Sequence, residues 1–208
     1  GIFGISWNHN YNTNLKQATS IFASFRDAYE PRPFNILEEN TFGFGIRSRF
    51  LGNTQVFGKN LNWTIGGELF RDTYKYGTFE NLYQDFPTGT GSVEGEQLSN
   101  FKEKRNYYNV FSEIDYKFSE KTTGSIGLNL NETSYILKDR FQASSTNPDQ
   151  SGSFKFKTIL SPKFGLSHLF SENISIFSSI SHGFSPISLQ ETLLPDGQIN
   201  TNLKPETG

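Results

Sequence analysis

The sequence predicts an all-β protein, an antiparallel transmembrane β-barrel of which this chain supplies about eight strands. Apolar and polar residues alternate with a period of two along most of the 208 residues, and no stretch has comparable helical periodicity. The connections between the alternating runs are short and long in turn. Aromatic residues make up 15% of the chain although its overall composition is polar, as expected of strands with one apolar face.

Eight runs account for the strand count, because the apolar residues in each run share one parity. Gly, Ser, Asn and charged residues dominate the opposite parity. Runs of about 10 to 17 residues are long enough to cross a bilayer and project beyond it, since about 9 to 11 suffice. In chain order the apolar members are Phe3, Ile5 and Trp7; Ile21, Ala23 and Phe25; Phe42, Phe44, Ile46 and Phe50; Leu61, Trp63, Ile65 and Leu69; Tyr108, Val110, Ile114, Tyr116 and Phe118; Ile126, Leu128 and Leu130; Phe154, Phe156, Leu160, Phe164, Leu166 and Phe170; and Ile174, Ile176 and Ile180.

The connections also favour a membrane barrel, because all the short ones fall at one end of the strands. Outer-membrane barrels have short periplasmic turns and longer extracellular loops, and soluble sandwiches have no physical reason for this asymmetry. The short links are Tyr11–Leu15, Gly52–Lys59, Ser119–Lys121 and Ser171–Asn173. The long links, expected outside the cell, are Tyr29–Thr41, Gly77–Arg105, Asp139–Ser153 and Ser185–Gly208.

The two faces of the strands differ in the environment they require. In water the apolar face would need a covering layer, and no amphipathic helix is visible to supply one. In lipid it needs no cover, and the polar face then lines a lumen. An eight-stranded barrel is only wide enough to be filled by side chains, so inward charges favour a wider cylinder. The charged residues expected in the lumen are Arg47, Arg49, Glu68, Glu113, Asp115, Lys117, Lys155 and Lys157.

Composition excludes several functions. The chain has no Cys and three His, so a Cys-ligated metal site or a thiol nucleophile is excluded, and we expect no metal site and no cofactor. A net charge of −2 gives no field that would attract nucleic acid. No phosphate-binding loop, zinc-protease helix or nucleophile elbow occurs, and we expect no catalytic residues and no enzyme activity. Ser181, His182 and Asp196 are nominal candidates for which chance adjacency is the better explanation.

Three short elements near the end of the sequence resemble the TonB-dependent outer-membrane receptor family. Gly183-Phe184-Ser185-Pro186 leads into a loop containing Glu191, and Asn200-Thr201-Asn202-Leu203-Lys204-Pro205-Glu206 follows. Leu160-Ser161-Pro162-Lys163-Phe164-Gly165 resembles the strand that precedes them in the family. Together they cover about 50 residues, and the alternation of the first 150 agrees with them.

The resemblance implies a barrel of about 22 strands with a plug domain that contacts the TonB system. Residues 1–208 would then be a segment of a single barrel domain, with the plug and the C-terminal strands outside it. Ferric siderophores or similar scarce chelates are the ligands the resemblance favours, and haem, cobalamin and saccharides are alternatives. A passive porin or adhesin barrel remains a second hypothesis, and a soluble β-rich binding protein a third.

Candidate ligand-binding residues lie in the predicted long loops, where rings and cations occur together. Stacking and charge-assisted hydrogen bonds suit an anionic, partly aromatic chelate. A structural role is an equal alternative for any single residue, since rings pack loops and Pro stiffens them. The candidates are Arg32, Phe34, Tyr83, Phe86, Arg105 and Arg140.

Overall fold

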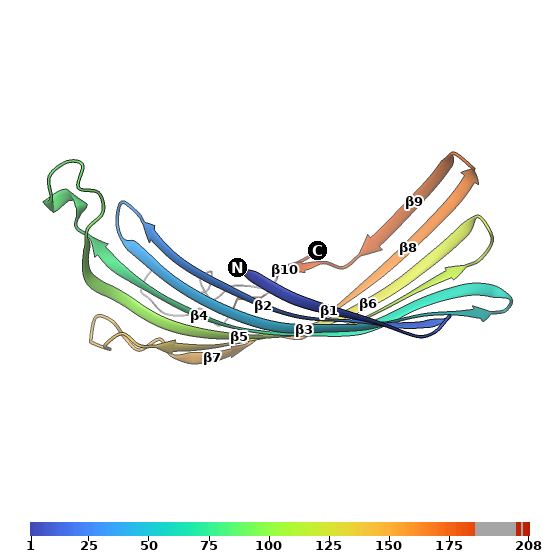
Figure 1. Ribbon diagram of the computed structural model, residues 1–208, viewed down its shortest axis with the longest axis horizontal. Coiled ribbons are helices and arrows are strands. Elements are labelled where there is room, and N and C mark those ends of the chain that lie inside the picture. The colour runs from blue at the N-terminus through green and yellow to red at the C-terminus, as the bar shows by residue number, and fades with distance from the viewer. Residues whose placement is uncertain (186–202, 205) are drawn as a thin grey trace.

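One curved antiparallel sheet makes up most of the molecule (Figure 1). The structure is a computed structural model, and it describes residues 1–185, 203–204 and 206–208. Eight strands lie in the order β1-β2-β3-β4-β5-β6-β8-β9, with β7 paired to β6 beside this path. β10 and β11 form a separate two-stranded ladder. The predicted all-β antiparallel architecture is therefore confirmed.

The strands of the sheet are long, and only one short helical turn interrupts them in the described residues. This is the 3₁₀ turn η1 (Tyr83–Asp85). No helix in that part of the chain is long and apolar enough to cross a membrane. The strands are β1 (Ile2–Asn12), β2 (Leu15–Pro31), β3 (Ile36–Val56), β4 (Lys59–Asn81), β5 (Glu94–Lys117), β6 (Thr122–Asp139), β7 (Gly152–Lys155), β8 (Ile159–Ser171), β9 (Ile174–Ser181), β10 (Phe184–Ser185) and β11 (Glu206–Thr207).

The short connections lie at one end of the sheet, as predicted. They join β1 to β2, β3 to β4, β5 to β6 and β8 to β9. Phe57 and Gly58 form the two-residue connection between β3 and β4, with φ angles of 49° and 70°. Two successive positive φ angles are typical of the hairpin turn that matches the twist of the flanking strands.

The long connections are shorter than predicted, because the strands continue into them. β3, β4 and β5 contain 21, 23 and 24 residues. The loops reduce to residues 32–35, 82–93 and 140–151. Alternation of apolar residues stops well before these strands end, but backbone pairing continues, for example between Asn40 and Lys75. Most of the predicted loop Ser185–Gly208 lies outside the described residues.

The seventh predicted strand is two strands, which is a correction. β7 pairs with residues 134–137 of β6, and β8 pairs with residues 122–131. Residues 156–158 separate them, and the two strands present even-numbered residues to opposite faces. Phe154 shares a face with Tyr135, whereas Leu160 shares the other face with Leu130. Continuous parity in the sequence concealed this reversal.

The register confirms that apolar residues of adjacent strands share a face. Ile21 is opposite Ile46, which is opposite Leu69, and Ile114 is opposite Ile126. Side chains directly opposite one another in a ladder lie on the same face of the sheet. We call this surface the apolar band, and its members are about half exposed or more. They are Phe3, Ile5, Trp7, Ile21, Phe25, Phe42, Phe44, Ile65, Leu69, Val110, Ile114, Ile126, Leu128, Leu130, Leu160, Phe164, Leu166, Ile176 and Ile180.

The opposite, polar face carries paired charges and the small buried core. Arg47 forms an ion pair with Glu68, and Lys163 Nζ lies 3.2 Å from Glu113 Oε2. The core cluster, Phe101, Tyr135 and Leu137 with Tyr76, Phe154 and Phe156 packed on it, lies towards the long connections. Lys155, predicted to face the lumen, instead lies on the face of the apolar band, because β7 reverses parity, and its Nζ is 3.0 Å from Glu132 Oε1.

Candidate ligand-binding site

The turns that follow β2 and β4 meet around a hollow of about 730 Å³, which we call the apical hollow. Arg32 lines it from the first turn, and Tyr83 and Phe86 line it from the second. Small-molecule sites commonly have volumes of about 300–1,000 Å³. The structure therefore brings three of the six predicted ligand-binding residues to one place.

Asn81, at the end of β4, joins the two turns. Its Nδ2 donates hydrogen bonds to the Arg32 carbonyl oxygen at 2.8 Å and to Ser92 Oγ at 3.1 Å. Its Oδ1 accepts from the backbone N–H groups of Tyr83 and Val93, each at 3.3 Å. One amide side chain thus fixes both walls of the apical hollow, and sequence reasoning did not identify it.

The first turn is tight and flanked by prolines. The backbone N–H of Arg32 donates to the carbonyl oxygen of Asn35 at 2.8 Å. Pro31 and Pro33 have fixed φ angles, so this short segment loses less conformational entropy on folding than other sequences would. The backbone that carries Arg32 is consequently held at the edge of the hollow.

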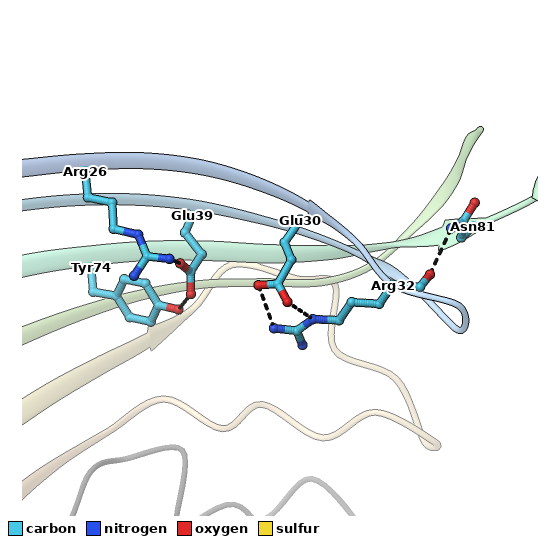
Figure 2. Close-up of polar contacts among 6 residues, drawn as sticks. All are labelled: Arg26, Glu30, Arg32, Glu39, Tyr74 and Asn81. Atoms are coloured by element: carbon cyan, nitrogen blue, oxygen red, sulfur yellow. Dashed lines mark hydrogen bonds and ion pairs between the residues drawn. The ribbon is translucent and has the colours of Figure 1, made fainter. Parts of the chain in front are cut away.

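The Arg32 guanidinium is paired with Glu30 through two hydrogen bonds (Figure 2). The Nε–Oε1 and Nη2–Oε2 distances are 3.0 and 3.1 Å. This contact lowers the pKa of Glu30 and raises the pKa of Arg32. Because both side chains are solvent-accessible, an anionic ligand that binds Arg32 must compete with the Glu30 carboxylate.

A second polar group lies on the polar face, further along the strands from the turns. Arg26 Nη2 is 3.3 Å from Glu39 Oε2, and the Tyr74 hydroxyl donates to the same carboxylate (Figure 2). Burial first, and then Glu39, raise the pKa of Tyr74, so its phenol remains a neutral donor. The ring of Tyr74 stacks on Tyr76, and Tyr76 stacks on Phe101, with centroids 4.7 and 5.1 Å apart. These rings form an aromatic platform facing the interior.

Three predicted residues lie away from the apical hollow. Arg105 is on the polar face, where it is ion-paired with Asp72 and its guanidinium carbon lies 5.7 Å from the Phe70 ring centroid. Arg140 follows β6, and its backbone N–H donates to the Asn100 carbonyl oxygen at 2.8 Å. Phe34 is at the tip of the first turn and is 74% exposed, but it does not line the hollow. The six residues are therefore not one cluster.

Glu103, two residues before Arg105 on the same face of β5, is buried. Burial, with the nearby Asp72 carboxylate as the second cause, raises its pKa to about 7, and Arg105 opposes this shift. Glu103 is therefore partly protonated near neutral pH. It lies in the extension of β5 beyond the apolar band, within the segment that the sequence predicts as the loop Gly77–Arg105.

Comparison with known proteins agrees with this architecture over the whole chain. The family model described as TonB dependent receptor-like, beta-barrel, matches residues 2–208. The chain belongs to the TonB-dependent receptor family. This family is located in the outer membrane of Gram-negative bacteria. No curated protein sequence matches the chain.

Solved TonB-dependent receptors share the fold at low sequence identity. The ferric citrate transporter FecA in its unliganded form has a TM-score of 0.78 at 9% identity, over 99% of this chain and 30% of that one. The siderophore receptor PiuA from Acinetobacter baumannii has a TM-score of 0.75 at 15% identity, over 99% and 36%. FpvA from P. aeruginosa, bound to a pyoverdine–iron complex, has a TM-score of 0.75 at 10% identity, over 99% and 29%. The chain thus spans about a third of the length of these receptors.

Proposed function

We propose that this chain is part of the barrel wall of an outer-membrane receptor that takes up a ferric siderophore or a similar anionic chelate. The membership of the family and the siderophore receptors among its structural neighbours support the class of function. Uptake would be coupled to the TonB system through a plug domain, and the sheet would face outer-membrane lipid with its apolar band. We propose no catalytic role for any residue.

The observation that carries the ligand class is the apical hollow, where Arg32 lines one wall and the aromatic side chains of Tyr83 and Phe86 line the other. Arg32 offers a planar donor suited to carboxylate, catecholate or hydroxamate oxygens. Tyr83 and Phe86 are partly exposed rings from the opposite wall, at 38% and 43%. Such rings can stack on the flat parts of an iron chelate. A chelate that moves from the apical hollow towards the interior would next contact the aromatic platform that contains Tyr74 and Tyr76.

Because Arg32 is paired with Glu30, replacing each residue in turn tests the proposal, and the two replacements should change ligand affinity in opposite directions. Ligand affinity of the purified full-length receptor would be measured by fluorescence quenching for ferric citrate, ferric catecholate and ferric hydroxamate chelates. Arg32→Gln should weaken binding of the preferred chelate about tenfold, or about 1.4 kcal/mol. Glu30→Gln should strengthen it, because the competing carboxylate is removed. Lys121→Gln, a cation in the short turn between β5 and β6, is the matched control and should change nothing. Unchanged affinity in Arg32→Gln, or weaker binding in Glu30→Gln, would contradict the role of Arg32.

A further inference from the structure

The turn between β3 and β4 carries an almost fully exposed aromatic side chain. Phe57 is 95% exposed, and among the described residues it is the only one other than glycine with a positive φ angle. A left-handed backbone is unfavourable for a residue with a Cβ atom, and hairpin turns of this kind favour Asn or Asp before Gly. Neither burial nor turn geometry therefore explains a phenylalanine at this position.

The turn lies beyond the apolar band and beyond the neighbouring strands. Lys59 lies between the turn and Leu61 on the band's face of β4, so the apolar surface ends before Phe57. The ladder with β2 ends at Gly52, and the ladder with β5 ends at Leu61. The tip of the hairpin consequently projects from the sheet at the end where the short connections lie (Figure 1).

Next to the turn, the polar face of the same hairpin carries paired amides. Asn53 is directly opposite Asn62, and Gln55 is directly opposite Asn60. They share a face with Glu68, because residues of even number on β4 lie on the polar face. None of these four side-chain amides is hydrogen bonded within the part of the chain that the structure describes. Each amide can both donate and accept hydrogen bonds, so the four together offer a ligand many uncharged partners.

A hollow of about 350 Å³ is lined by these amides, and we call it the amide hollow. A second hollow, of about 360 Å³, shares Asn14, Asn53 and Asn62 with it, so the two are continuous. The charged residues that line the second hollow are Lys16 and Asp115, whose charges balance. Every residue that lines the amide hollow has an amide or hydroxyl side chain: Asn14, Asn53, Thr54, Gln55, Asn60 and Asn62.

This combination of groups suits an uncharged chain of N-acetylated sugars. Sugar hydroxyl and acetamido groups both donate and accept hydrogen bonds, as Asn and Gln amides do. The C–H groups on the face of a sugar ring carry partial positive charge and pack on the negative face of an aromatic ring. An ionic ligand would find no net counter-charge in either hollow. An extended peptide would add to a free strand edge, and β3 offers one only at residues 54–56, because the Asn53 N–H donates to the Asn14 carbonyl oxygen.

We propose that Phe57 and the amide hollow bind the glycan strands of the bacterial cell wall, which are polymers of N-acetylated sugars. Phe57 follows Gln55 by two residues, about 7 Å along the strand, so one oligosaccharide can contact both the ring and the amides. The short connections are expected in the periplasm, where these glycan strands are located. The receptor would then be held against the cell wall from its periplasmic side. The proposal rests on the membrane topology but not on the siderophore, so the two tests fail separately.

The test measures sugar binding by the purified full-length receptor in micelles of an amine-oxide detergent, which carries no sugar. The receptor is titrated by calorimetry with chitohexaose, a hexamer of N-acetylglucosamine. Maltohexaose, a glucose hexamer without acetamido groups, and cell-wall stem peptides are titrated in parallel. Phe57→Asn removes the ring and places a residue that tolerates a positive φ angle in the turn. Asn62→Ala removes an amide from the hollow, and Asn173→Ala, an exposed amide in the connection between β8 and β9, is the matched control.

We expect Phe57→Asn to weaken chitohexaose binding at least about tenfold and Asn62→Ala at least about threefold, whereas Asn173→Ala stays within about twofold of the parent. The thermal unfolding midpoint of Phe57→Asn should equal or exceed that of the parent, which separates lost binding from misfolding. Maltohexaose and the stem peptides should bind the parent at least about tenfold more weakly than chitohexaose.

Three results would overturn the proposal. The first is a parent receptor that does not bind chitohexaose at millimolar concentration, and the second is equal affinity in the parent and Phe57→Asn. The third is binding of maltohexaose or of the stem peptides as tight as that of chitohexaose. Tight binding of maltohexaose would indicate a site for glucose polymers, and tight binding of the peptides would indicate a peptide-docking surface.

Discussion

Replacing Leu128 by arginine tests which face of the sheet meets lipid. Leu128 lies between Ile126 and Leu130 in the apolar band, and its opposite neighbours are Ser112 and Pro162. The next carboxylate along β6 on that face, Glu132, is four residues away, about 13 Å, and it is already paired with Lys155. An arginine at this position therefore lacks a local counter-charge. An arginine near the midplane of a membrane barrel costs about 2 to 4 kcal/mol, and we expect Leu128→Arg to lie in that range.

Asn129→Arg is the matched control, one residue away on the opposite face. The Asn129 side-chain oxygen has no hydrogen-bond partner in the described part of the chain, so replacing Asn129 breaks no hydrogen bond at that atom. We expect a cost below about 1 kcal/mol, as for substitutions away from buried networks. Guanidinium unfolding of the full-length receptor in phospholipid vesicles measures both values. Equal destabilisation by the two variants, or a larger loss at Asn129, would refute the assignment of the faces.

Two further predictions follow from the fold. Cysteine introduced at Gly89, in the connection between β4 and β5, should be labelled by an impermeant maleimide on intact cells, and cysteine at Thr122 should not; the reverse pattern would invert the topology. Because the pKa of Glu103 is raised from its ordinary 4.5 to about 7, the folded state retains a proton that the unfolded state releases. The free energy of unfolding should therefore fall by up to about 3 kcal/mol as the pH rises from 4.5 to 7, and Glu103→Gln should remove that slope; a slope retained in Glu103→Gln would contradict the shift.

Residue parity was enough to predict which residues lie on the apolar face in the middle of the sheet. Ile21, Ile46 and Leu69 follow the same alternation in sequence and lie side by side in the structure. This worked because a one-residue slip would move an entire apolar set to the other face. The same reasoning gave a wrong result for Phe154 and Leu160. These two residues have the same parity but lie on opposite faces of the sheet, because residues 156–158 reverse the faces without changing the alternation in the sequence.

The site was only partly predictable, because its geometry depends on register in segments with no apolar alternation. Arg32, Tyr83 and Phe86 were found by residue type alone. The clamp formed by Asn81 and the pairing of Arg32 with Glu30 require knowledge of which strand ends are adjacent.

Energy dependence of uptake tests the central claim most directly. Cells producing the full-length receptor would be given the iron-55 form of the chelate that binds it best, with and without a protonophore that collapses the proton gradient. We predict accumulation that stops when the gradient is lost, while binding of the chelate at the cell surface persists. Accumulation that continues unchanged without the gradient would show a passive pore and contradict energy-coupled uptake.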